Sequence, residues 1–81
     1  MFLLDYKIDD IVQFYIDGFF QDGMPYGELD DGTLVEVKDI PLDQVLPFFR
    51  YRNPLNAKIL KKTIQNGQLC LTCTFISAEP L

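Results

Sequence analysis

Alternating apolar and polar positions predict the first β-strand near the start of the chain. The segment IVQFYI, residues 11–16, is rich in β-branched and aromatic residues, which favour strands. Successive side chains of a strand point to opposite faces, so the alternation predicts one buried and one exposed face. We expect Val12, Phe14 and Ile16 on the first face, and Ile11, Gln13 and Tyr15 on the second.

Turn residues divide the next part of the chain into short segments. Asp17-Gly18 and Asp22-Gly23 are turn dipeptides, because glycine accepts positive φ and aspartate hydrogen-bonds to its own turn. A second strand is predicted at residues 26–29, and Asp30-Asp31-Gly32 predicts a hairpin before a third strand at residues 33–38. In that third strand Val35 and Val37 should face inward and Glu36 and Lys38 should face water. The segment therefore predicts a β-meander.

The middle of the chain favours little regular structure. Leu42, Val45 and Leu46 suggest at most one short helical turn, because Pro47 interrupts any longer helix.

Two interpretations remain open for residues 54–67. Asn53 as N-cap, Pro54 as first helical residue and Gly67 just past the end describe a helix of about three turns near residues 54–65. Its apolar stripe would consist of Leu55, Ile59 and Leu60. Asn66-Gly67 between two apolar runs equally predicts a β-hairpin. The paired start and stop signals favour the helix.

The last predicted element is the strand LCLTCTFI, residues 69–76. Its buried face should consist of Leu69, Leu71, Cys73 and Phe75. Together these elements predict a mainly β, β-rich α+β fold, in one small domain spanning residues 1–81. We expect a small antiparallel sheet or a small barrel, with the eleven Phe and Tyr residues supplying most of the core.

Turn glycines, alternating valines and a later proline form a further pattern between residues 11 and 59. Its positions are Asp22-Gly23, Gly27, Gly32, Val35, Val37, Pro41, Val45 and Ala57 to Ile59. In these positions the stretch resembles the TRAM domain, a small OB-like β-barrel that accompanies RNA-modifying enzymes and also occurs alone. The resemblance implies an OB-like or SH3-like barrel and binding to RNA. The sequence departs from the family at Leu42-Asp43, where the family has Gly-Glu, and its meander is acidic where an RNA-binding barrel carries Lys and Arg.

Charge is distributed unevenly along the chain, whose net charge is −5. Residues 1–49 hold eleven of the twelve acidic residues and two lysines, whereas residues 50–81 hold five cations and one glutamate. Cations interleaved with aromatics are typical of nucleic-acid-binding surfaces. The candidates for such a surface are Arg50, Tyr51, Arg52, Lys58, Lys61 and Lys62. The favoured alternative is that these side chains form the solvated face of one element.

Several kinds of chemistry have no support in the sequence. The chain contains no histidine, the usual general base and commonest metal ligand. Cys70 and Cys73 form a CxxC pair inside a strand pattern, so we expect buried strand residues and no zinc or redox site. The pairs Asp9-Asp10 and Asp30-Asp31 lack the spacing of a calcium-binding EF-hand loop. We therefore predict no catalytic residues, no metal and no cofactor.

The location of the protein is predicted from the same residues. Two cysteines do not provide the multi-disulfide framework of small secreted domains, and we identify no signal peptide. The apolar opening MFLL is too short to cross a bilayer, so we expect a cytoplasmic protein without membrane association.

Three functional hypotheses follow from the charge and the turns. The first is a non-enzymatic adaptor or inhibitor that docks on a basic protein surface, one that otherwise holds nucleic acid. Its docking residues would be Asp22, Glu28, Asp30 and Asp31, with Phe20, Met24 and Tyr26 as anchors. The second hypothesis is a module that binds RNA or single-stranded DNA through the basic segment at residues 50–62. The third is a structural subunit of a larger assembly, including a homo-oligomer.

Overall fold

The computed structural model describes residues 6–40 and 42–78. The apolar opening at residues 1–4 and Pro41 lie outside the described residues. The described part is mostly β, with one short helix, as the sequence predicts. The elements are β1 (Ile11–Phe14), β2 (Gly18–Phe19), β3 (Pro25–Glu28), β4 (Leu34–Val37), α2 (Leu42–Arg50), β5 (Leu55–Gln65) and β6 (Gln68–Ala78).

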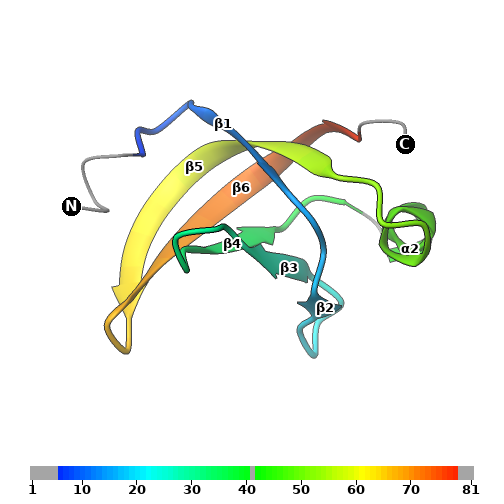
Figure 1. The fold of residues 1–81 in the computed structure, drawn as a ribbon, viewed down its shortest axis with the longest axis horizontal. Helices are drawn as coiled ribbons and strands as arrows, with labels where there is room; N and C mark the ends of the chain where they lie inside the picture. The colour runs from blue at the N-terminus through cyan, green and yellow to red at the C-terminus, as the bar shows by residue number, and fades with distance from the viewer. Residues whose placement is uncertain (1–5, 41, 79–81) are drawn as a thin grey trace.

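All strands belong to one curled sheet in the order β1-β5-β6-β4-β3-β2. The sheet forms a half-barrel around the long, curved β5–β6 pair, and α2 lies beside it (Figure 1). Neighbouring strands are antiparallel, except that β4 and β6 are parallel. The predicted meander is therefore correct only for β3 and β4, because β1 pairs with β5 instead and the neighbour of β3 is β2, a strand that the sequence did not predict.

The two outermost strands of the sheet are consecutive segments of the chain. β1 pairs with β5, and after three residues the chain continues into β2, which pairs with β3. The Asp17 amide, between the two strands, donates to the Tyr26 carbonyl at 2.8 Å. The turn predicted at Asp17-Gly18 is thus wrong, because Gly18 begins β2. Because β1 and β2 lie at opposite ends of the strand order but are joined by only three residues, the sheet must curl to bring its two end strands together.

The core lies inside the curl and is built from alternate strand residues. The predicted burial of Val12, Phe14 and Ile16 is confirmed, and Val35 and Val37 are fully buried. In β6 the residues Leu69, Leu71 and Cys73 are buried as predicted, Phe75 is half-buried, and Cys70 is buried as well. Glu36 is half-buried rather than fully solvated, and its Oε1 accepts a 3.0 Å hydrogen bond from the Thr72 hydroxyl.

The helix favoured for residues 54–65 is wrong, because this segment is strand β5 and forms a hairpin with β6. Burial alternates at the start of β5, where Leu55, Ala57 and Ile59 are fully buried. Asn66 and Gly67 have φ of 54° and 80°, the pair of positive values that a tight hairpin turn requires. Pro54 precedes the strand, where a missing amide hydrogen costs nothing in the ladder.

A helix occurs instead at residues 42–50, where at most one short turn was expected. Pro47 lies inside it but removes only the hydrogen bond to the Asp43 carbonyl, and its ring is exposed. Val45 is fully buried against the core. Asp43 in the first turn and Arg50 in the last turn both complement the helix dipole. Burial of an apolar side chain therefore outweighs the proline signal.

Neither α2 nor any other stretch of the described residues makes a helix with the length and apolar character that crossing a membrane requires.

Candidate functional site

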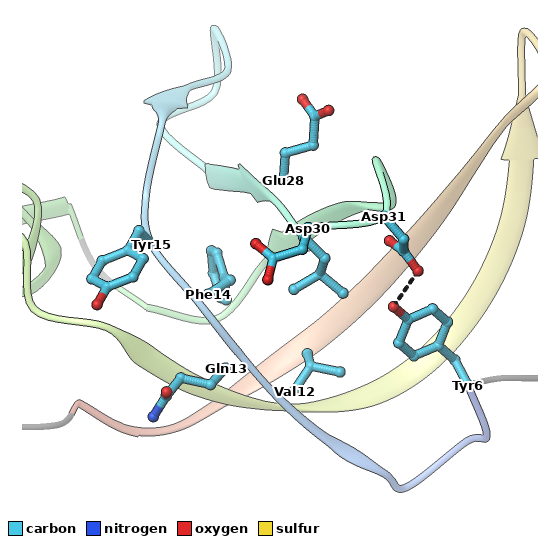
Figure 2. Close-up of a pocket in the computed structure, with 9 residues that line it drawn as sticks. Tyr6, Val12, Gln13, Phe14, Tyr15, Glu28, Asp30 and Asp31 are labelled. Carbon is cyan, nitrogen blue, oxygen red and sulfur yellow. Dashed lines mark hydrogen bonds between the residues drawn. The ribbon is translucent and has the colours of Figure 1, made fainter. Parts of the chain in front are cut away.

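An open groove of about 510 Å³ lies between β1 and the turn that joins β3 to β4 (Figure 2). Its base is apolar, because Val12 and Phe14 contribute to the groove from the core and Leu29 packs against them. Its rim is polar and comes from three separate segments of the chain. The rim residues are Tyr6, Gln13, Tyr15, Glu28, Asp30 and Asp31.

The alternation of β1 explains its contribution to the groove. Gln13 and Tyr15 lie on the exposed face of the strand, between the buried residues of the core. The Gln13 side-chain amide donates to Asn56 Oδ1 of β5 at 3.1 Å, which fixes its position on the rim.

Gly27 closes the groove at the Tyr15 end. A Cβ added to Gly27 would lie 2.1 Å from the Tyr15 carbonyl oxygen and 2.5 Å from Cδ2 of Phe14. Only a glycine permits this approach, so β3 touches the chain directly after β1 at this point. Beyond this contact, toward Ile11, β1 and the β3–β4 turn separate and leave the groove between them (Figure 2).

A hydrogen bond spans the opposite end of the groove. The Tyr6 hydroxyl donates to Asp31 Oδ2 at 2.6 Å, and the Thr33 amide donates to Asp31 Oδ1 at 2.9 Å. The hydrogen bond from Tyr6 and then that from Thr33 favour the charged carboxylate, so the pKa of Asp31 lies below its ordinary value. Asp31 is therefore ionised throughout the neutral pH range.

In the part of the chain that the structure describes, cations lie at both ends of the groove but not along its lining. The Lys62 ammonium donates to the Tyr6 carbonyl at 2.6 Å. The Arg52 guanidinium lies 5.2 Å from the centre of the Tyr15 ring, and its Nη1 donates to the Ile16 carbonyl at 3.4 Å. Among the described residues that line the groove there are three carboxylates and no Lys or Arg. The groove is therefore acidic.

The predicted docking residues separate into two groups in the structure. Glu28, Asp30 and Asp31 all line the groove, although the Glu28 side chain points away from its apolar base (Figure 2). The other predicted docking residues lie around the β2–β3 turn, where Phe20 and Tyr26 pack with ring centres 4.7 Å apart. Asp22 shapes that turn, since its Oδ1 accepts the Met24 amide at 3.0 Å. Phe20, Met24 and Tyr26 are thus no anchors of the groove.

The predicted nucleic-acid-binding residues are spread over several elements. Arg50 and Tyr51 are exposed at the end of α2, and Lys58 and Lys61 lie on β5. Arg52 and Lys62 lie at opposite ends of the groove, in the contacts described above. The structure therefore does not bring the six residues together.

Sequence reasoning missed three rim residues, Tyr6, Gln13 and Tyr15. The exposed positions of the β1 pattern identify Gln13 and Tyr15 as surface residues, although nothing in the sequence places them opposite residues 28–31. Tyr6 precedes the first predicted strand and gives no signal of its own.

The two cysteines of the chain both lie on β6. Cys70 and Cys73 are both buried and free, in agreement with the strand interpretation. Burial and, to a smaller extent, the charge of Glu36 raise the pKa of the Cys73 thiol to about 12, which disfavours the reactive thiolate. Across residues 6–40 and 42–78, no three His, Cys, Asp or Glu side chains are grouped so that they could hold a metal ion.

Comparisons with protein-family models, curated proteins and solved structures give no significant match to this chain. The TRAM resemblance thus stays a prediction from the sequence.

Proposed function

We propose that this chain is a non-enzymatic binding protein that docks on a basic segment of a protein partner through the groove between β1 and the β3–β4 turn. One observation carries the proposal: three acidic residues line the groove over an apolar base, and no cation is found among the lining residues that the structure describes. An adaptor or inhibitor in the cytoplasm would use such a groove to occupy a basic surface.

The two components of the groove have different roles in this proposal. Val12 and Phe14 are already buried in the core, so the apolar base, completed by the half-buried Leu29, would supply affinity mainly by taking apolar side chains of the partner out of water. The carboxylates of Glu28, Asp30 and Asp31 attract a cationic partner, accelerate its association and repel acidic competitors. The net charge of −5 acts in the same direction at longer range.

The contacts of the cations support a protein partner over a nucleic acid. Arg52 lies over the Tyr15 ring and so occupies a surface on which a nucleic-acid base would stack. Lys62 is hydrogen-bonded to the backbone carbonyl of Tyr6. Phosphates approaching the groove would meet its carboxylates, so binding there would lack the charge neutralisation on which nucleic-acid affinity depends.

The proposal is tested with a fluorescent peptide of about eight residues in which lysine and valine alternate, a length typical of one strand. We expect the peptide to bind at about 50 mM salt and to weaken at about 300 mM, because salt screens exposed charges. Asp30→Lys should reduce affinity by about tenfold, which corresponds to about 1.4 kcal/mol.

Asp43→Lys is the matched control, because it changes the net charge equally at an exposed position on α2 away from the groove. It should leave the affinity within about twofold of the parent value. Equal losses in both variants, or no peptide binding, would contradict the proposal. Tighter binding of a labelled oligouridine than of the peptide would assign the chain to nucleic acid instead.

A further inference from the structure

Strand β1 has an edge that no strand in the described part of the chain covers. It lies at one end of the sheet order, so within residues 6–40 and 42–78 its only strand partner is β5. Its second edge runs along the groove, opposite the β3–β4 turn (Figure 2). An uncovered edge presents backbone amides and carbonyls that can pair with another extended chain.

The register of β1 and β5 identifies the backbone groups on this edge. Ile11 is opposite Lys58, and the Ile59 amide donates to the Asp10 carbonyl at 2.9 Å. Hydrogen-bonded and non-hydrogen-bonded pairs alternate along an antiparallel ladder. Val12 and Phe14 therefore point their backbone groups at β5, whereas those of Ile11 and Gln13 point away from it.

Tyr15 shows that this second edge faces β3. It belongs to the same alternate set as Ile11 and Gln13, and its carbonyl oxygen lies directly against Gly27 of β3. The edge is thus closed by β3 at Tyr15 and open to the groove at Gln13 and Ile11. The open part of the edge therefore has room for an added strand of about four residues, each of which advances the strand by about 3.3 Å.

We infer that the groove binds an extended cationic peptide as an additional strand along the free edge of β1. This inference rests on the proposed function and specifies how the partner is held. Main-chain hydrogen bonds to Ile11 and Gln13 would supply affinity, and alternate side chains would supply specificity. Apolar side chains of the peptide would face Val12 and Phe14, and the intervening cationic ones would lie beside the acidic rim.

The charge of the rim selects this occupant over a second copy of the chain. A free edge commonly pairs with the same edge of another molecule unless charges prevent it. Two copies would bring together two sets of the carboxylates of Glu28, Asp30 and Asp31, and like charges repel at short range. A peptide with alternating Lys or Arg converts the same charges into attraction.

N-methylation of the lysine–valine peptide tests the inference, because a methylated amide cannot donate to a neighbouring strand. If the peptide adds as an antiparallel strand, its residues opposite Ile11 and Gln13 have their side chains on the same face of the sheet as Ile11 and Gln13, away from the core. The same peptide residues point their backbone amides at β1. In the proposed arrangement these residues are the lysines. Methylating the lysine amides should weaken binding by about tenfold or more, whereas methylating the valine amides should change it by less than about threefold.

Other outcomes of this experiment are also decisive. Loss of binding only in the valine-methylated peptide would support a parallel added strand, in which the amide directions are exchanged. Equal binding of both methylated peptides, or equal losses, would overturn strand addition. If Asp30→Lys still weakened the unmethylated peptide, the proposed function would stand without this inference.

A pair of variants at Gln13 tests the edge from the side of the protein. Gln13→Pro removes the amide that points into the groove but no amide that pairs with β5, and proline is tolerated on edge strands. Gln13→Ala is the control, since both variants lose the side-chain bond to Asn56. Gln13→Pro should bind about tenfold more weakly than Gln13→Ala. Equal affinity of two folded variants would overturn the inference, and the methylated peptides decide it if Gln13→Pro does not fold.

Discussion

The Tyr6 hydroxyl and the Asp31 carboxylate are joined by a 2.6 Å hydrogen bond that connects the segment before β1 to the β3–β4 turn. The two residues are 25 positions apart in the chain. The bond closes one end of the groove and fixes the charge of one of its three carboxylates. Both effects should be visible in the stability of the protein.

Tyr6→Phe should lower the free energy of unfolding at neutral pH by about 0.5 kcal/mol, the lower end of the range for one hydrogen bond because Asp31 is exposed. The folded-state pKa of Asp31 is depressed below 3.8, so its stabilising contribution is present above that pH. The contribution disappears as pH falls through the folded-state pKa. The difference between the variant and the parent should therefore shrink in acid.

Urea unfolding between neutral pH and about pH 3 measures this difference. Tyr15→Phe is the matched control, because the contact that Tyr15 makes with Arg52 involves its ring. A difference between Tyr6→Phe and the parent that stayed constant down to the lowest pH would show that Asp31 is not the partner that matters.

Gly27→Ala should destabilise the protein by about 3 kcal/mol or more, because overpacking against rigid neighbours is costly. The new Cβ would lie 2.1 Å from a backbone oxygen that cannot move without disturbing β1. Gly67→Ala has open space around its Cβ and should cost only about 1 kcal/mol for its positive φ. Thermal unfolding compares the two variants, and similar losses would contradict the close packing of β1 on β3.

Pro47→Ala should stabilise the protein by about 1 kcal/mol, because it restores a hydrogen bond and a good helix former inside α2. The gain is smaller than the full proline penalty, since alanine also gives the unfolded chain more freedom. Pro47→Gly restores the same bond without the helix propensity and should be about 1 kcal/mol less stable than Pro47→Ala. Chemical denaturation followed by circular dichroism measures both values. A loss of stability in Pro47→Ala would contradict a helix at this position.

The buried thiol of Cys73 should react slowly with iodoacetamide while the protein is folded. At about pH 8 a pKa near 12 leaves very little thiolate, so labelling should be at least about a hundredfold slower than in urea. Cys70→Ala leaves Cys73 as the single thiol of the chain and assigns the rate by mass spectrometry. Rapid labelling of this folded variant would show that β6 opens readily or that Cys73 is accessible.

Local patterns predicted most strands, because each strand has an apolar face that must be buried. Val12 and Phe14, Val35 and Val37, and Leu71 and Cys73 all occupy the core positions that their alternation predicts. Turn residues likewise predicted the hairpin at residues 30–32. They also predicted a hairpin at Asn66-Gly67 as the alternative to a helix, and that alternative is correct.

The two wrong predictions of helical structure arose from residues that are compatible with more than one local structure. Pro54 and Gly67 fit the ends of a helix, but they equally fit the residue before a strand and the turn after it. Pro47 is compatible with a nine-residue helix because only one hydrogen bond is lost. Tertiary burial determined the structure of both segments: Ile59 is buried as part of strand β5, and Val45 is buried as part of helix α2.

The groove was predictable only in part, because its rim combines residues that are distant in the chain. Glu28, Asp30 and Asp31 were identified from charge and turn chemistry within a single hairpin. Gln13 and Tyr15 join them only because the segment after β1 reaches β3, which depends on the whole strand order. The parallel pairing of β4 with β6 has no local signature in the sequence either.

The pairing of β1 with the distant strand β5 has a consequence for how the protein is made. Gln13 of β1 pairs with Asn56 of β5, which is synthesised 43 positions later, so β1 has no partner strand until then. On the ribosome the first strand therefore emerges long before the hairpin that receives it, and such distant pairings slow folding. We expect a nascent chain in which the late β5–β6 hairpin nucleates the sheet and the first strand docks last.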